Sequence, residues 1–167
     1  MRAYRYVGSS RIADRVASQP PGTRVSSADD VLNWIRQTGH RPAECVVTYV
    51  IDSAGELRIA DRHSEHVACA GGGPVLSAGE LTFAVTAGRV EVIAVSNQST
   101  GYCPEPESWS AVARALNAVG LNVPAGFNPV CVFRRCPGCG TTNVVKDGGF
   151  ECGACSSPLP VAYNCQS

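Results

Sequence analysis

The sequence predicts an α+β fold, in which antiparallel β-hairpins pack with two or three helices and a zinc ribbon follows at the C-terminal end. Two observations support this prediction. The strand-like segments follow one another in pairs joined by short turns, and two Cys-x2-Cys pairs stand near the end of the 167-residue chain. We expect a core domain over residues 1–128 and the ribbon over residues 129–167.

The composition is that of a folded protein without net charge. Hydrophobic residues make up 44% of the chain and charged residues 17%, and 14 basic residues balance 14 acidic ones. A disordered chain would carry fewer apolar residues and more net charge. A neutral chain has no overall electrostatic attraction to nucleic acid or to an anionic membrane, so we expect neither as a partner.

The first forty residues contain one clear helix. We expect a short strand at residues 3–7 and a turn at the Pro-Pro-Gly sequence of residues 20–22. A hydroxyl N-cap and two acids at residues 26–30 predict the start of a helix, and Gly39 predicts its end. The apolar face of this helix comprises Val31, Leu32, Trp34 and Ile35.

Two β-hairpins are expected next. Residues 45–60 contain two β-rich runs around a polar turn at residues 52–55, and residues 79–96 repeat the pattern around a turn at residues 86–88. A second helix is predicted at residues 108–119, with Gly120 as its stop. Its apolar face comprises Trp109, Val112, Ala113 and Leu116, and a strand is expected at residues 129–135.

The most specific pattern is CPGCGTTNVVKDGGFECGAC at residues 136–155, in which twelve residues separate two Cys-x2-Cys pairs. Each pair predicts a tight knuckle that aims two thiolates at one point. The insert predicts a hairpin, with residues 143–146 and 150–151 as its strands, that brings the knuckles together. Four thiolates match the tetrahedral coordination of structural zinc and leave no open position for catalysis. The predicted Zn²⁺ ligands are Cys136, Cys139, Cys152 and Cys155.

The ribbon is expected either to stabilise the core as a cap or to dock a protein partner. A ribbon that binds nucleic acid usually carries more basic and aromatic residues than this one. The other cysteines are expected to be separate, mostly buried thiols, namely Cys45, Cys69, Cys103, Cys131 and Cys165.

The number of cysteines and the first residues of the chain both indicate the cellular compartment of the protein. Nine cysteines is an odd number, so a disulfide framework is not expected. No signal peptide is evident in the first twenty residues, and the longest apolar stretches are too short to cross a bilayer. The sequence therefore predicts a cytoplasmic location and no membrane association.

Polar residues suited to acid–base chemistry gather in the middle of the chain. The two ends of a hairpin are neighbours, so Glu80 should lie near the loop at residues 97–102, and the glycines at residues 71–73 should bring His66 there. We predict a catalytic set in which His66 is the acid or base, Glu80 orients it or stabilises charge, and Tyr102 donates a proton. Asn97, Ser99, His63 and Glu65 are the candidate ligand-binding residues.

This segment resembles one in known proteins. Residues 66–80 have the sequence HVACAGGGPVLSAGE, and residues 99–104 have the sequence STGYCP. Over residues 45–106 the chain resembles plant IQ-motif calmodulin-binding proteins and bacterial effector or toxin-like proteins, which carry HSSFxAGxPVxxAGE followed by SGHYxP. The chain departs from this pattern at residues 67–69 and 100–101. The resemblance points to His66, Glu80 and Tyr102 as positions rather than to a reaction. The whole arrangement is similar to an uncharacterised bacterial family with a zinc ribbon.

Several alternatives remain open at this point. His66 and Glu80 could simply fix a glycine-rich turn, and Tyr102 could be a structural tyrosine. The sequence His63-Ser64-Glu65 has the His-x-Glu form of zinc deaminases, which need a further Cys-x-x-Cys pair. A second zinc site at His66, Cys69 and Cys103 and a thiol nucleophile at Cys69 or Cys103 are weaker alternatives. The glycines at residues 71–73 could cradle a phosphate.

Two functions from different classes follow. The first is a small-molecule ligand or catalytic site in the α+β core, built around His66, Glu80 and Tyr102. The second is a non-catalytic interaction module that docks a protein partner through its ribbon.

Overall fold

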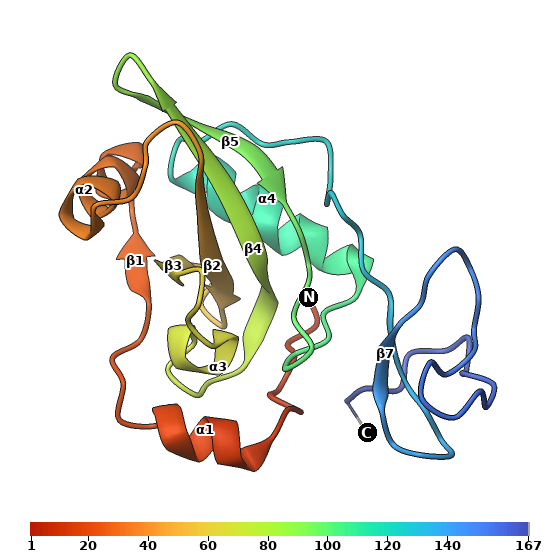
Figure 1. The fold of residues 1–167 in the computed structure, drawn as a ribbon. Helices are drawn as coiled ribbons and strands as arrows, with labels where there is room; N and C mark the ends of the chain where they lie inside the picture. Colours follow the sequence, from red (N-terminus) through yellow and green to blue (C-terminus); the bar gives the residue numbers. More distant parts are fainter. Residues whose placement is uncertain (167) are drawn as a thin grey trace.

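The computed structural model describes residues 1–166, and it confirms the predicted α+β fold. A five-stranded antiparallel sheet has the order β1-β3-β2-β4-β5, and a two-stranded hairpin follows near the C-terminus (Figure 1). The elements are α1 (Ser10–Val16), β1 (Thr23–Val25), α2 (Ala28–Thr38), β2 (Cys45–Asp52), β3 (Leu57–Asp61), α3 (His66–Cys69), β4 (Val75–Thr86), β5 (Arg89–Val95), the 3₁₀ turn η1 (Pro106–Ser108), α4 (Trp109–Ala118), β6 (Phe133–Arg135) and β7 (Thr142–Val144).

Both predicted hairpins form. β2 pairs with β3 around the turn at residues 53–56, and β4 pairs with β5 around Ala87 and Gly88. β4 begins four residues earlier than Gly79, the predicted start, because its first residue, Val75, pairs with Asp52 of β2 and also bridges to Tyr4. That bridge is all that forms of the strand expected at residues 3–7, so that prediction is wrong.

Helices α2 and α4 form where the sequence predicts them. A capping box begins α2, in which Asp30 accepts hydrogen bonds from the backbone amides of Ser26 and Ser27 at 2.7 and 3.1 Å. Gly39 follows α2 with φ of 71°, the left-handed conformation that ends many helices. Helix α1 and strand β1 were not predicted. Both are short, and each buries a single residue, Val16 and Val25 respectively, so their local signals are weak.

Helices cover both faces of the sheet. Along β2, Val47, Tyr49 and Ile51 point into a core that they share with α2 and α4. The intervening Val50 packs with α1 and α3 in a second cluster. This alternation follows from the two-residue period of a β-strand, so the almost continuous apolar sequence of β2 indicates burial on both faces.

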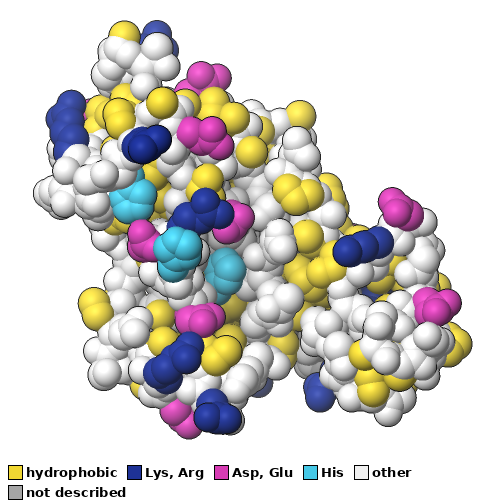
Figure 2. Space-filling model, in the orientation of Figure 1, with side chains coloured by type: hydrophobic (Ala, Val, Ile, Leu, Met, Phe, Trp, Pro, Cys, Tyr) yellow, Lys and Arg dark blue, Asp and Glu magenta, His cyan; other side chains and the backbone are white. Residues whose placement is uncertain are grey.

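One face of the core is rich in titratable side chains. Histidine side chains gather on one face of the core, among acidic and basic side chains (Figure 2). The C-terminal segment forms a lobe beside the sheet (Figure 1).

No helix within residues 1–166 is long and apolar enough to span a membrane.

The chain after β5 crosses back over the sheet at Gly79. A Cβ atom at this position would overlap the carbonyl oxygen of Ser96. The same carbonyl accepts a hydrogen bond from the buried hydroxyl of Tyr49 at 2.9 Å, so it cannot move away without loss. Gly79 therefore permits the close crossing that places the loop at residues 97–104 against the core.

We predict that Gly79→Ala lowers the free energy of unfolding by at least about 2 kcal/mol, because a side chain is forced against backbone in a closely packed site. Gly126→Ala is the matched control, since nothing lies within 4 Å of the added methyl group. Chemical denaturation measures both variants. Equal stability of the two variants would contradict the crossing described here.

Candidate metal centre and polar cluster

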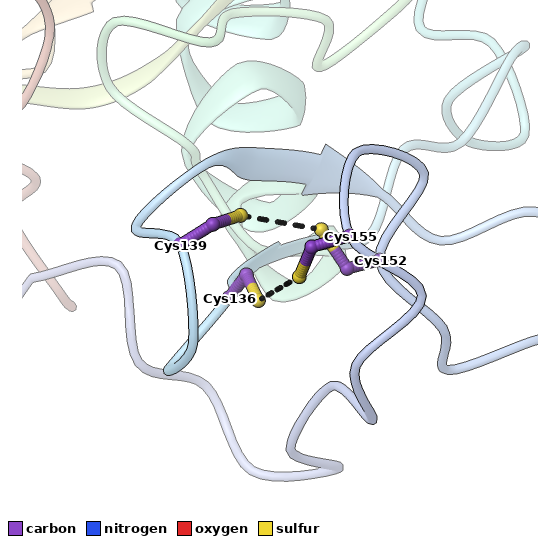
Figure 3. A group of neighbouring side chains, drawn as sticks. All are labelled: Cys136, Cys139, Cys152 and Cys155. Atoms are coloured by element: carbon purple, nitrogen blue, oxygen red, sulfur yellow. Dashed lines mark hydrogen bonds between the residues drawn. The ribbon is translucent and has the colours of Figure 1, made fainter.

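The four predicted ligands converge at one point (Figure 3). The sulfur atoms of Cys136, Cys139, Cys152 and Cys155 all lie within 4.8 Å of one another. Two sulfur pairs, Cys136 with Cys155 and Cys139 with Cys152, are 3.6 Å apart. Sulfurs bound to one tetrahedral Zn²⁺ at about 2.3 Å would be separated by about 3.8 Å. The spacing therefore suits a single ion with four thiolate ligands.

The two knuckles repeat the same backbone geometry sixteen residues apart. In the first, Cys136 donates its backbone N–H to Thr141 at 2.8 Å and accepts from Gly140 at 2.9 Å. In the second, Cys152 donates to Ser157 at 2.9 Å and accepts from Ser156 at 2.9 Å. The repeat shows that each Cys-x2-Cys pair is a complete local unit, held by its own hydrogen bonds.

The second cysteine of each knuckle also has an equivalent hydroxyl neighbour. Thr141 Oγ1 lies 3.3 Å from the sulfur of Cys139, and Ser157 Oγ lies 3.2 Å from the sulfur of Cys155. Hydroxyl groups at these distances can donate hydrogen bonds to metal-bound thiolates and disperse their charge.

Further donors surround Cys152. Its sulfur accepts from the amide of Ala154 at 3.4 Å and from the side-chain amide of Asn143 at 3.5 Å. Hydrogen bonds from the amides of Ala154 and Cys155 lower the pKa of Cys152 to about 6, because they stabilise the thiolate. Asn143 also accepts from the amide of Gly153 at 2.9 Å, so it joins β7 to the second knuckle.

The hairpin of the ribbon differs from the predicted one. β7 pairs with β6 upstream and not with residues 150–151, and Glu151 forms a single bridge to Pro158. The strand expected at residues 129–135 is reduced to Phe133–Arg135. At Cys131 the Asn97 side chain bonds both the backbone N–H and the backbone C=O, each at 2.7 Å, so neither group is available to a neighbouring strand.

Buried polar contacts join the C-terminal segment to the core. Arg134 forms a 2.8 Å ion pair with Glu105, and their side chains are only 8% and 13% exposed. Its guanidinium also donates to the carbonyl of Val161. Tyr163 donates its hydroxyl hydrogen to the carbonyl of Cys103 at 2.8 Å. These contacts fix the orientation of the ribbon relative to the sheet.

The thiols outside the knuckles are buried, as predicted. Cys103, Cys131 and Cys165 pack with Phe133 between the core and the ribbon. Cys45 and Cys69 lie within the two main core clusters. Within residues 1–166 the four ribbon cysteines form the one group of three or more potential metal ligands, so no second site joins His66, Cys69 and Cys103.

His66 is partly buried at the start of α3. Its Nε2 lies 3.0 Å from the carbonyl oxygen of Gly79, and because a carbonyl can only accept, Nε2 carries the hydrogen. Burial lowers the pKa of His66, while the hydrogen bond to Gly79 and the charges of Glu80 and Glu65 oppose that shift. The imidazole is thus held neutral, with Nδ1 as its remaining acceptor.

Glu80 lies beside this histidine on β4. Its backbone pairs with Ser96, while its carboxylate is 42% exposed and lies 3.9 Å from the guanidinium of Arg62. The charge of Glu80 acts on the His66 ring, so the two side chains lie within electrostatic range of each other.

Tyr102, Asn97 and Ser99, which were also predicted as site residues, are buried within the protein. Tyr102 is fully buried and donates to the carbonyl of Gly73 at 2.8 Å. Asn97 is also buried and bridges Pro104 and Cys131. The hydroxyl of Ser99 is the one buried side-chain polar atom without a hydrogen-bond partner among residues 1–166. In the described part of the chain, no hydrogen bond joins Tyr102 to His66 or Glu80.

His63 and Glu65 lie nearer the surface. His63 is exposed and donates its backbone N–H to Asp61 at 2.9 Å, while Glu65 forms an exposed ion pair with Arg15 at 3.4 Å. Both Cys-x2-Cys pairs belong to one cluster, so neither remains to complete a deaminase site with His63. Gly71 and Gly72 adopt positive φ and end α3 through hydrogen bonds to its carbonyls, which accounts for the glycine run.

Comparison of the chain with protein-family models, curated proteins and solved structures found no match. The conclusions about function therefore depend on the geometry of the chain itself.

The knuckle repeat predicts a stabilising substitution. Gly140 and Ser156 occupy equivalent positions and both have positive φ, 76° and 59°, a conformation that costs a non-glycine residue about 1 kcal/mol. We expect Ser156→Gly to slow hydrogen exchange of the ribbon amides about threefold, and the reciprocal Gly140→Ser to speed it by a similar factor. Effects of the same sign in the two variants, or no effect in either, would contradict this equivalence.

Proposed function

We propose that the four-cysteine cluster binds one Zn²⁺ as a structural ion. The observation that carries this proposal is the convergence of four sulfurs at tetrahedral spacing, with backbone amides directed at two of them. The four side chains Cys136, Cys139, Cys152 and Cys155 would complete its coordination. A site with four protein ligands offers no position for a substrate, so the ion would have a structural role.

The ribbon needs such an ion because its own apolar core is small. The buried residues around the cluster are Cys136, Cys152 and Leu159, with Val145 and Phe150 packed against them. Metal binding in small ribbons supplies the folding free energy that hydrophobic burial cannot. By ordering the ribbon, the ion would also help to fix the C-terminal segment on the core. The contacts between these two parts involve Asn97, Arg134 and Tyr163.

We predict one zinc ion per chain by native mass spectrometry, and its loss in Cys152→Ser. Acidification should also release the ion, because protons compete with zinc for the thiolates. Cys45→Ser is the control, since this thiol lies in the sheet core and should not affect the zinc content. Retention of one ion by Cys152→Ser would contradict the assignment.

We propose, as a second function, that His66 and Glu80 form the ligand or proton-transfer site of the core. A neutral imidazole with Nδ1 available is a proton acceptor, and the neighbouring carboxylate would stabilise its charged form. In this proposal Tyr102, Asn97 and Ser99 support the surrounding loop. His63 and Glu65 would contact the ligand at the surface. The ligand would be a small molecule.

The first test is an NMR titration of the His66 ring. We expect its pKa to lie below the ordinary value of about 6.5, and Glu80→Gln to lower it further, because a favourable negative charge is removed. Since the folded pKa is below the unfolded one, folding stability should fall as pH drops through about 6.5. Glu91→Gln is the control. A ring that does not titrate, or that ignores Glu80→Gln, would refute the site.

An interaction role for the ribbon remains the alternative proposal. Val130 and Val161 are 54% and 74% exposed in and beside the ribbon lobe, and exposed aliphatic side chains are frequent in protein interfaces. A partner that binds the zinc-loaded chain and is lost on Val161→Asp would support this role, whereas undiminished binding would oppose it.

A further inference from the structure

A groove of about 550 Å³ lies on the histidine-rich face, apart from the proposed His66 and Glu80 site. Four segments form it: the loop before β1, the last turns of α2, the end of β3, and the segment that includes α3. His40, the histidine that the sequence patterns left unassigned, lies on its wall together with Asp61. Neither His66 nor Glu80 lines this groove.

His40 is held in one orientation from three directions. Its ring stacks on Trp34 with centroids 4.8 Å apart and an interplanar angle of 28°. Its Nδ1 lies 2.6 Å from Thr38 Oγ1, and its Nε2 lies 3.2 Å from Asp61 Oδ2. Since a carboxylate only accepts, Nε2 donates to Asp61. The imidazole thereby fixes one carboxylate oxygen at the groove wall.

Asp61 remains available to a ligand. Its second oxygen accepts the backbone N–H of His63 at 2.9 Å, yet its side chain is 49% exposed. The hydrogen bond from His63 and the contacts with His63 and His40 lower the pKa of Asp61, so this carboxylate stays ionised near neutral pH. Each oxygen can accept a further hydrogen bond, because a carboxylate oxygen has two lone pairs.

The surroundings give this groove negative character. No Lys or Arg belongs to its described lining residues. The neighbouring Arg58 is paired with Asp52, and Arg62 faces Glu80. The C-terminal end of α2, which carries the negative end of the helix dipole, forms part of the wall.

Part of the remaining wall is apolar. Pro20, Pro21 and Ala68 line it, and Gly22 packs against Cys69 so closely that a Cβ there would lie 2.5 Å from the sulfur. A short hydrocarbon chain fits these apolar residues, and the polar lining residues Gln19, Thr23 and Ser64 are uncharged, so they offer no ion-pair partner to a second charged group.

We propose that this groove binds a small organic amine. Its ammonium group would donate to the exposed lone pairs of Asp61, and its hydrocarbon part would lie along Pro20, Pro21 and Ala68. His40 is a positioning residue, which holds the carboxylate in place. This site is independent of the proposed roles of the zinc ribbon and of His66.

The test uses n-butylamine as the probe on the full-length, zinc-loaded chain. We expect saturable NMR shifts of the His40 ring and of the Asp61 amide, with a dissociation constant in the millimolar range typical of so small a ligand. Asp61→Asn should weaken binding about tenfold, because a charged hydrogen bond is lost. Asp147→Asn, in the ribbon, is the matched control and should bind normally.

A second variant and two further probes keep the test decisive. Thr38→Leu places a larger apolar side chain in the groove and removes the hydroxyl that holds His40, so it should abolish binding although the Asp61 carboxylate itself is retained. Its backbone NMR spectrum reports whether the fold is kept. Neither n-butanol nor butyrate should bind measurably. Equal binding of n-butanol, unchanged affinity in Asp61→Asn, or no saturable binding of n-butylamine would each overturn the proposal.

Discussion

One buried carboxamide connects the two parts of this molecule. The side chain of Asn97 follows the last strand of the sheet and satisfies the carbonyl of Pro104 and both backbone groups of Cys131. These groups lie where water does not reach, so without Asn97 each would be buried without a partner. The path of the chain from the sheet to the ribbon depends on this residue, as does the position from which the ribbon begins.

The neighbouring contacts extend the same constraint. Arg134 is buried, and its charge is acceptable there because Glu105 pairs with it and the Val161 carbonyl accepts its other donors. Gln166 exchanges hydrogen bonds with the backbone of Arg5 at 2.7 and 3.0 Å, which joins the first and last described segments. Polar pairing therefore orients the lobe, and apolar burial around Phe133 closes the junction.

The parts of the fold that could be predicted are those with a local signal. The capping residues and Gly39 define α2 within its own sequence, and alternation with short turns defines both hairpins. The four-cysteine cluster was predictable because two-residue spacing determines the shape of each knuckle. The prediction that His66 lies near Glu80 used the hairpin at residues 79–96 together with the glycine run at residues 71–73.

The remaining features depend on contacts between distant segments. The start of β6 lies just after Cys131, which the distant Asn97 holds, and no local pattern near residue 133 reveals that contact. Tyr102 has the chemistry of a proton donor, but its burial against Gly73 is a property of the folded chain. His40 carried no motif, because its partners Trp34 and Asp61 meet it only when α2 packs beside β3.

The sixteen-residue repeat of the knuckles has a consequence for how the ribbon could assemble. Each knuckle closes its own backbone turn with internal hydrogen bonds, and Asn143 of β7 adds support to the second. An incoming ion could therefore be captured first by either pair and then enclosed by the other. Assembly would then have two routes, one starting from each knuckle.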